Sequence, residues 1–171
     1  MEKELSSFTY STPLGRVTIA SDGFAITGLS YGERDYPGVL RATELTNRAA
    51  NQLQEYLAGK RQAFELPLDP AGTDFQRQVW RALLDIPYGQ TRSYSQVAEA
   101  IGKPSACRAV GGANNKNPIP IFIPCHRVVG ANGQLGGYAD GLHIKRYLLD
   151  LERRTLEELE DDGTEGTSTK S

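Results

Sequence analysis

The segment from Asn117 to Cys125, Asn-Pro-Ile-Pro-Ile-Phe-Ile-Pro-Cys, constrains the fold of this chain more than any other stretch. Its three prolines lack the backbone N–H that a sheet ladder or a helix interior requires, and each restricts the residue before it to extended backbone. The isoleucines between them are apolar anchors that need a core to pack against. We therefore expect a buried, extended connector outside any sheet, followed directly by a cysteine and a histidine.

The residues 1–70 predict a strand-rich α/β lobe. Segments 8–10 and 16–20, joined by a turn at 12–15, indicate a β-hairpin, and 25–29 indicates a further strand. Leu45 to Leu57 has the spacing of an amphipathic helix, which Gly59 ends. The segment from Pro67 to Gly72 is the expected linker. No group of residues in this lobe indicates a chemical function.

The next part of the chain predicts a helix–turn–helix. Asp74 is the expected N-cap of its first helix, and Ser93 is the expected N-cap of its second. Pro104 opens a third helix over residues 105–113. The expected fold class is therefore α+β, an α/β lobe followed by a mainly helical lobe that contains the helix–turn–helix.

The C-terminal part predicts one more helix and a tail. Leu142 to about Leu159 is amphipathic, with Ile144, Leu148 and Leu151 on the face toward the core. After it, glycine, threonine, serine and glutamate predominate, which is typical of a disordered segment. We thus place the helical lobe at residues 71–160 and an acidic disordered tail at 161–171.

The composition is that of an ordinary globular protein of 171 residues, 39% hydrophobic and 23% charged. No apolar run approaches the ~20 residues of a membrane span, and the acidic start does not resemble a signal peptide. We expect a cytoplasmic protein with no membrane partner. The two cysteines, Cys107 and Cys125, are too few for a disulfide framework, and with His126 and His143 they match no zinc spacing. No metal or cofactor is expected.

The charge is distributed unevenly along the chain, although its net value is only −2. Residues 1–71 balance to −2 and residues 152–171 to −4, whereas residues 72–151 carry nine basic and five acidic side chains, a balance of +4. A basic middle part favours a nucleic-acid partner. A chance fluctuation explains the same numbers equally well.

The predicted third helix, Ser-Ala-Cys-Arg-Ala-Val-Gly-Gly-Ala, consists of small residues except for Arg108 and Val110. Each of its two glycines costs ~1 kcal/mol of helix stability relative to alanine. Close packing against another element is one explanation, because small residues allow backbones to approach. Close approach to DNA is the other, since an ordinary helix ~10–12 Å across does not fit a minor groove ~6 Å wide.

The adjacent Cys125 and His126 are a candidate thiolate–base pair, because only the thiolate attacks and a base or a cation must favour it. Neighbouring residues on a regular strand point to opposite faces. The pair can therefore work together only if the backbone turns there or if water bridges them. A carboxylate that orients the imidazole would complete a relay, and the last helix offers Asp150 and Glu152.

The run Asn-Pro-Ile-Pro-Ile-Phe-Ile-Pro-Cys-His-Arg-Val-Val, residues 117–129, resembles the active-site signature of the O6-alkylguanine-DNA alkyltransferases. The flanking segments Arg-Ala-Val-Gly-Gly-Ala-Asn-Asn and Gly-Gly-Tyr-Ala-Asp-Gly-Leu fit the same family in order and spacing, and the match is continuous from about Phe75 to Glu152. The N-terminal lobe resembles the ribonuclease-H-like lobe of that family in size and pattern. The compact plan looks like the stand-alone bacterial type.

This resemblance implies a repair protein that flips an alkylated guanine out of DNA and takes its alkyl group, once and irreversibly. It implies these catalytic roles: Cys125 as acceptor, His126 as its base through water, Glu152 orienting His126, Asn117 holding the active-site backbone, and Tyr94 rotating the nucleotide and assisting the leaving guanine. The expected guanine pocket consists of Cys125, Val128, Tyr138, Ala139 and Asn114. The expected DNA contacts are Arg108, which fills the vacated stack, with Tyr94, Ser95, Lys103, Ala106 and Cys107.

The expected partner is double-stranded DNA that contains O6-alkylguanine, bound through its minor groove by a monomer. A guanine O6 is inaccessible inside a paired duplex, so flipping is required, and a thioether product offers water no carbonyl to attack. Two other functions stay open. A cysteine hydrolase would use the same Cys, His and Glu over many turnovers, and a lesion-binding protein or helix–turn–helix regulator would not react at all.

Overall fold

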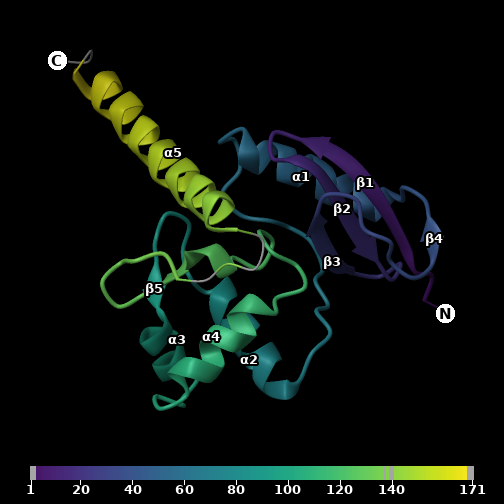
Figure 1. Ribbon diagram of the computed structural model, residues 1–171. Helices are drawn as coiled ribbons and strands as arrows, with labels where there is room; N and C mark the ends of the chain where they lie inside the picture. The colour runs from purple at the N-terminus through teal and green to yellow at the C-terminus, as the bar shows by residue number, and fades with distance from the viewer. Residues whose placement is uncertain (1–2, 137, 139–140, 169–171) are drawn as a thin grey trace.

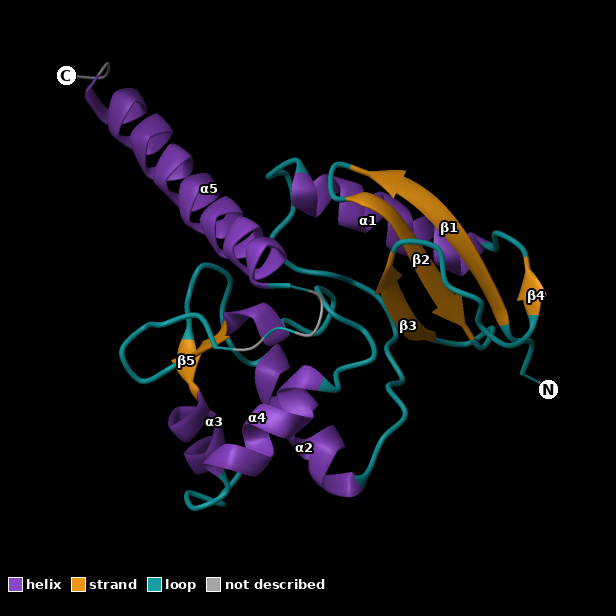
Figure 2. Ribbon diagram, in the orientation of Figure 1, coloured by secondary structure: helices purple, strands orange, loops and turns teal. Residues whose placement is uncertain are grey.

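The computed structural model describes residues 3–136, 138 and 141–168, which form two lobes joined by an extended segment (Figure 1). The N-terminal lobe combines a small sheet with one helix, and the C-terminal lobe is mainly helical (Figure 2). The α+β fold class predicted from the sequence is thereby confirmed.

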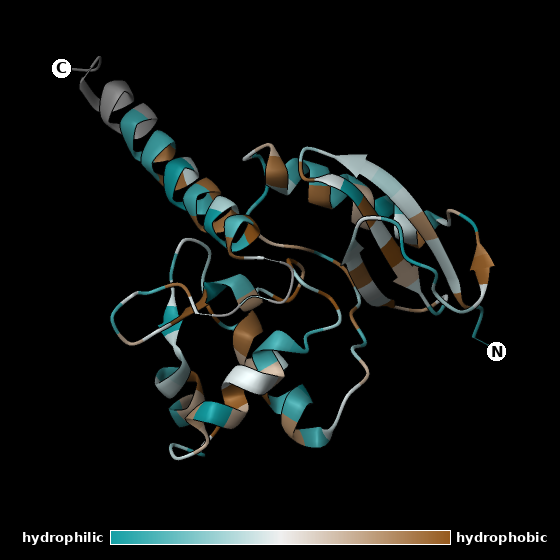
Figure 3. Ribbon diagram, in the orientation of Figure 1, coloured by the Kyte–Doolittle hydropathy of each residue, from teal (hydrophilic) through white to brown (hydrophobic). Residues whose placement is uncertain are grey.

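The N-terminal sheet has four strands in the order β3-β2-β1-β4. The predicted hairpin is present, with β1 at Ser6–Thr12 and β2 at Gly15–Ser21 paired antiparallel, and β3 at Ile26–Tyr31 pairs antiparallel with β2. The sequence did not indicate β4, Val39–Leu40, a two-residue edge strand parallel to β1. Its side chains are exposed although they are hydrophobic (brown in Figure 3), so this strand lacks the buried alternation that identifies the others.

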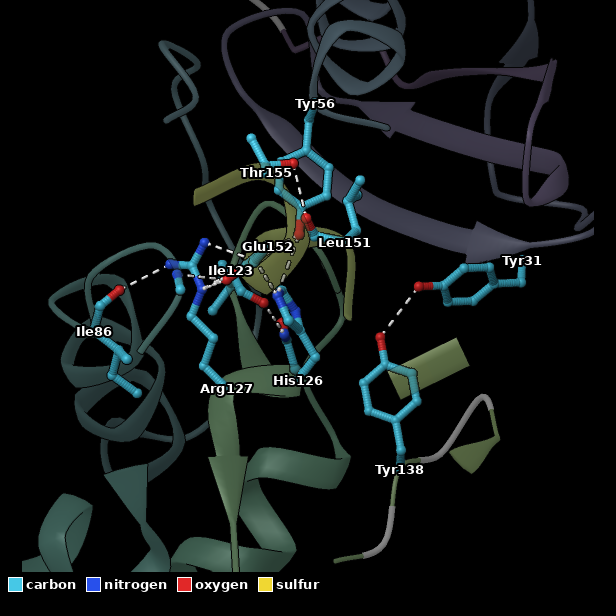
Figure 4. A network of polar contacts seen from close by, with 12 residues as sticks. Tyr31, Tyr56, Ile86, Ile123, His126, Arg127, Tyr138, Leu151, Glu152 and Thr155 are labelled. Atoms are coloured by element: carbon cyan, nitrogen blue, oxygen red, sulfur yellow. Dashed lines mark hydrogen bonds and ion pairs between the residues drawn. The ribbon is translucent and has the colours of Figure 1, made fainter. Parts of the chain in front are cut away.

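Helix α1, Glu44–Leu57, packs on this sheet and confirms the helix predicted from Leu45 to Leu57. A capping box starts it: the Thr43 side chain accepts from the Thr46 backbone, and the Thr46 side chain accepts from the Thr43 backbone. Its buried face carries Ala49, Leu53 and Tyr56. Tyr56 lies at the end of the helix that is near the other lobe (Figure 4).

The C-terminal lobe begins with the helix–turn–helix, α2 at Asp74–Leu84 and α3 at Tyr94–Ala100. Ser93 caps α3 as predicted, but α2 is capped by Thr73 rather than by Asp74. The reason is that Thr73 and Gln76 form a reciprocal capping box, which puts Asp74 in the first turn, where its charge favours the helix dipole.

Helix α4, Cys107–Asn115, packs against both α2 and α3. It was predicted over residues 105–113, two residues too early at each end. Its N-cap, Ala106, provides no side-chain hydrogen bond, so the sequence contains no capping signal that would mark the start. A two-stranded parallel ladder joins β5, Arg92–Ser93, to β6, Val128–Val129, and so ties α3 to the segment after Cys125.

The proline-containing connector is buried from Ile119 through Val129, as predicted, and lies beside the N-terminal lobe. The Leu29 N–H of β3 donates to the Pro118 carbonyl at 3.0 Å. Ile121 adopts φ 72°, a left-handed conformation that is unfavourable for a β-branched residue. Its side chain is only 1% exposed, so core packing holds it there.

Helix α5, Leu142–Ser168, is longer than predicted. Its first turns are packed in the core, where Lys145, Leu148 and Glu152 are buried, and its C-terminal part projects away from both lobes (Figure 1). It continues through the first eight residues of the segment for which the composition predicted a disordered tail. The stretch before Gly163 is rich in glutamate and leucine, which are good helix formers, so the helix continues into solvent without a core beneath it. No helix among the described residues is long and apolar enough to cross a membrane.

Candidate active site

Cys125 lies where the connector turns, at the start of the short 3₁₀ helix η1, Cys125–Arg127. The turn resolves the geometric problem posed by the sequence, because Cys125 and His126 do not lie on opposite faces of a strand. The Asn114 side chain of α4 donates to the Cys125 carbonyl at 3.2 Å, and the Cys125 N–H donates to the Ile123 carbonyl at 2.8 Å. Cys125 is 4% exposed, so a substrate must reach it through an opening rather than across a surface.

His126 is fully buried, and its Nε2 lies 2.7 Å from Oε2 of Glu152 on α5. The nearby carboxylate indicates that Nε2 carries the proton, which leaves Nδ1 as an acceptor. Nδ1 has no hydrogen-bond partner among the described residues. Burial lowers the pKa of His126, against the opposing effect of Glu152, so the ring is neutral at physiological pH and Nδ1 can accept a proton.

Glu152 is held from several directions, as Figure 4 shows. Arg127 binds it with Nε at 2.9 Å from Oε1 and Nη2 at 2.9 Å from Oε2, and the Gly89 N–H donates to Oε1 at 2.9 Å. The Tyr56 hydroxyl donates to Oε2 at 2.6 Å. Burial alone would raise the pKa of Glu152, but the hydrogen bonds and positive charges of His126 and Arg127 outweigh it and lower the pKa to about 2.

The other candidate carboxylate, Asp150, does not take part in this group. Its side chain is 47% exposed and pairs with Arg153, one turn along the same helix face, at 3.5 Å. Of the two carboxylates that the sequence offered, only Glu152 therefore meets His126.

Asn117 braces the connector on which Cys125 sits. Its Nδ2 donates to the Ile123 carbonyl at 2.9 Å, and its Oδ1 accepts from the Ile119 N–H at 3.0 Å. These two bonds join both ends of the proline run and replace the ladder partners that an extended segment outside a sheet lacks. Asn117 is thus placed where it can hold the backbone that carries Cys125.

Tyr94, at the start of α3, is half-buried between α4 and the loop after β6. A Cβ on Gly136 would lie 2.3 Å from the Tyr94 hydroxyl oxygen, so any larger residue there would displace the Tyr94 ring. Burial raises the pKa of Tyr94, and the charges of Cys125 and Cys107 add to that effect, which brings Tyr94 into the electrostatic neighbourhood of both cysteines.

Two profiles of one protein family match this chain. The family model for the "6-O-methylguanine DNA methyltransferase, ribonuclease-like domain" matches residues 7–70. The model for the "6-O-methylguanine DNA methyltransferase, DNA binding domain" matches residues 74–154. The chain belongs to the 6-O-methylguanine DNA methyltransferase family.

The chain aligns with similar proteins over most of their length and of its own. The methylated-DNA–protein-cysteine methyltransferase of Methanosarcina barkeri is 47% identical over 150 residues, 85% of this chain and 95% of that protein. The constitutive enzyme of that name from Bacillus subtilis is 46% identical over 159 residues, 88% of this chain and 96% of that protein. The crystal structure of Mycobacterium tuberculosis OGT in complex with DNA matches with a TM-score of 0.82 at 45% identity, covering 88% of this chain and 94% of that one.

The exposed face of α4 carries Arg108, for which the sequence predicts a DNA contact. Arg108, Ala109 and Gly112 are exposed on it, and Arg108 is the long side chain among them. A Cβ on Gly112 would meet nothing within 4 Å, and one on Gly111 would make an ordinary 3.7 Å contact with Tyr94. Packing within the described chain therefore requires neither glycine, which favours the second explanation, close approach of a partner.

The remaining predicted DNA contacts lie around α3 and α4. Ser95 is exposed, with its Oγ 3.6 Å from the Cys107 sulfur, and Ala106 is partly exposed at the start of α4. Lys103 extends back over α2, where its Nζ donates to Gln78 at 3.2 Å and lies 5.2 Å from the centre of the Phe75 ring. Lys103 must release this contact before it can reach a phosphate.

The predicted guanine pocket is described only in part. Tyr138 is buried, and its hydroxyl lies 3.1 Å from that of Tyr31 on β3, a contact between the two lobes (Figure 4). Val128 is buried in β6. Asn114 is buried beside Cys125, whereas Ala139 lies outside the described residues.

Three residues of the methyltransferase site were missed from the sequence. Arg127 stands in the quoted motif, Tyr56 lies in the lobe that showed no chemical pattern, and Lys145 is completely buried on α5. Burial lowers the pKa of Lys145, while the charge of Cys125 raises it. The sequence signal for Lys145 was its position between Ile144 and Leu148, on the helix face predicted to point toward the core. Among the residues that the structure describes, no three His, Cys, Asp or Glu side chains gather as metal ligands would.

Proposed function

We propose that this chain repairs O6-alkylguanine in DNA by irreversible transfer of the alkyl group to Cys125. The observation that carries the proposal is the buried relay behind this cysteine. Its neighbour His126 is neutral, with Nε2 bound to Glu152 at 2.7 Å and Nδ1 available as a proton acceptor. Family membership supports the same conclusion, since the relatives are named methylated-DNA–protein-cysteine methyltransferases.

The reaction follows from these groups. The Cys125 thiol passes its proton through water to Nδ1 of His126, and Glu152 stabilises the imidazolium that forms. The thiolate sulfur then attacks the alkyl carbon, and a C–S bond forms as the bond from that carbon to guanine O6 breaks. Guanine keeps the electron pair and takes up a proton, for which we assign the Tyr94 hydroxyl as donor. Because water has no easy route to a thioether, the protein acts once.

Because Cys125 is buried, a guanine stacked inside the duplex cannot reach its sulfur, which supports flipping of the nucleotide out of the DNA. With α4 in the minor groove, its slim exposed face fits where an ordinary helix does not, and Arg108 occupies the gap left by the flipped guanine. The +4 balance of residues 72–151 supports contacts with phosphates. We further propose that the chain binds as a monomer and acts in the cytoplasm, which sedimentation on DNA and cell fractionation would test.

Intact-protein mass spectrometry tests the proposal directly. Mixed with an excess of duplex DNA that contains O6-methylguanine, the protein should gain one methyl group, located on Cys125. Cys125→Ser should gain none and should still bind DNA, whereas Cys107→Ser should react like the unmodified chain. Continued release of a methyl product would instead indicate a cysteine hydrolase. DNA binding without any gain of mass would indicate a non-catalytic lesion binder.

A further inference from the structure

The carboxylate of the relay has a partner from the other lobe. Tyr56 is the penultimate residue of α1, in the ribonuclease-like lobe, yet its hydroxyl lies 2.6 Å from Oε2 of Glu152 and 3.4 Å from Nε2 of His126. The residue is completely buried. Its ring packs against Phe64 at 5.3 Å and, edge to face, against Tyr88 at 6.1 Å between centroids. The hydroxyl is therefore held in place by aromatic packing and not by Glu152 alone.

The direction of this hydrogen bond is fixed. Burial, followed by the negative charge of Glu152, raises the pKa of Tyr56 well above its usual range, so the hydroxyl keeps its proton and donates it. Oε2 thus accepts from Tyr56, from His126 and from Nη2 of Arg127. A carboxylate oxygen that accepts several hydrogen bonds is less basic than one that accepts a single bond. It consequently stabilises a protonated His126 less strongly.

We propose that Tyr56 is a positioning residue of the proton relay, one that sets both the orientation of Glu152 and the basicity of His126 from the N-terminal lobe. This inference rests on the proposed function. It gives the ribonuclease-like lobe, which carried no recognisable chemical pattern, a direct part in activating the cysteine.

The other charged groups around His126 act differently from Tyr56. Arg127 of η1 and Lys145 of α5 disfavour the imidazolium by their positive charge, and Glu152 of α5 favours it. Tyr56 of α1 adds no charge and only moderates Glu152. Removal of its hydroxyl therefore strengthens the pull of Glu152 on the His126 proton, and His126 should require a higher pH to become neutral.

The test is the pH dependence of transfer from free O6-benzylguanine, a substrate that needs no flipping. In Tyr56→Phe, which keeps the ring, the acid limb of the single-turnover rate should move to higher pH by about 0.5–1 unit, as expected for one charge-assisted hydrogen bond among several. The rate near the alkaline plateau should change much less. Tyr88→Phe is the matched control, because that hydroxyl makes no hydrogen bond to Glu152, and its profile should coincide with that of the unmodified chain.

Two results would overturn the inference. An unchanged profile for Tyr56→Phe would leave the hydroxyl without a role, and a rate reduced equally at every pH would show only a loosened core. If Tyr56→Phe does not fold, 3-fluorotyrosine at position 56 retains ring and hydroxyl but donates more strongly, and it should move the acid limb to lower pH. No shift there would be equally decisive. Failure of the proposed function is separate, since the unmodified chain would then transfer nothing.

Discussion

Replacement of Glu152 by glutamine changes one buried oxygen into an NH₂ group and should destabilise the fold by about 3–5 kcal/mol at neutral pH. The carboxylate accepts hydrogen bonds from Gly89, Tyr56, His126 and Arg127. In its better orientation, the glutamine oxygen takes the Oε2 position and keeps the Tyr56, His126 and Nη2 donors. The NH₂ group then faces the Gly89 N–H and the Arg127 Nε–H.

Two considerations set the magnitude. The NH₂ group offers no acceptor to the Gly89 N–H, which is only partly buried, and leaves the Arg127 Nε–H with the longer 3.2 Å contact to the Oε2 position, so these losses contribute on the order of 1–3 kcal/mol together. Independently, removal of one partner from a buried ion pair costs about 3–5 kcal/mol, because here the Arg127 guanidinium, 7% exposed, loses its counter-charge. A loss of this size is a large part of the 5–15 kcal/mol that typically stabilises a domain.

Urea unfolding at neutral pH, followed by far-UV circular dichroism, measures this loss. Asp150→Asn on the same helix is the matched control and should change the unfolding free energy by less than about 0.5 kcal/mol, because its pair with Arg153 is exposed. In the double variant Glu152→Gln/Arg127→Met, the cost should be clearly smaller than the sum of the two single costs. A loss below about 1 kcal/mol for Glu152→Gln, or additive costs in the double variant, would refute the reasoning.

Further outcomes follow from the same structure. Gly136→Ala should slow transfer from both duplex DNA and O6-benzylguanine, because the added Cβ would lie 2.3 Å from the Tyr94 hydroxyl oxygen; equal single-turnover rates would contradict this. Gly112→Ala should leave the urea midpoint unchanged or raise it, since the added Cβ meets nothing within 4 Å and alanine gains up to ~1 kcal/mol in a helix. Arg108→Ala should slow transfer from duplex DNA but hardly from the free base, and an equal loss on both would assign Arg108 to the pocket instead. The urea midpoint should fall on acidification from about pH 6.5 toward pH 2. The reason is that the folded-state pKa values of Glu152, about 2, and of His126 are both lowered, so the unfolded chain takes up protons at a higher pH than the folded chain does. A midpoint constant over that range would count against the buried relay.

The sequence was most informative where local chemistry decides the structure. The hairpin, the helix from Leu45 to Leu57 and the buried proline run could be predicted, because periodicity and missing N–H donors act over a few residues. The ends of α2 and α4 were less predictable. Thr73 and Asp74 are both good N-caps, and Ala106 gives no signal at all.

The candidate site was predictable to the extent that its residues share one motif. Cys125 and His126 are adjacent, and Glu152 was one of two carboxylates available on the last helix. Tyr56 could not be found in this way, because it is 96 residues from Glu152 in the chain and its own lobe shows no chemical pattern. Such a contact follows from how two lobes dock, which local periodicity does not encode.

The contacts of Glu152 also bear on when the site assembles during synthesis of the chain. Tyr56, Gly89, His126 and Arg127 are all synthesised before Glu152, whose carboxylate accepts a hydrogen bond from each of them. Until α5 docks, the Arg127 guanidinium has no counter-charge in the core among the described residues, so burying it is unfavourable and opposes closure of the two lobes. A nascent chain that ends before Glu152 should stay open around an accessible Cys125 thiol. The reactive cysteine would then acquire its relay and its protection from solvent in the same late step of folding.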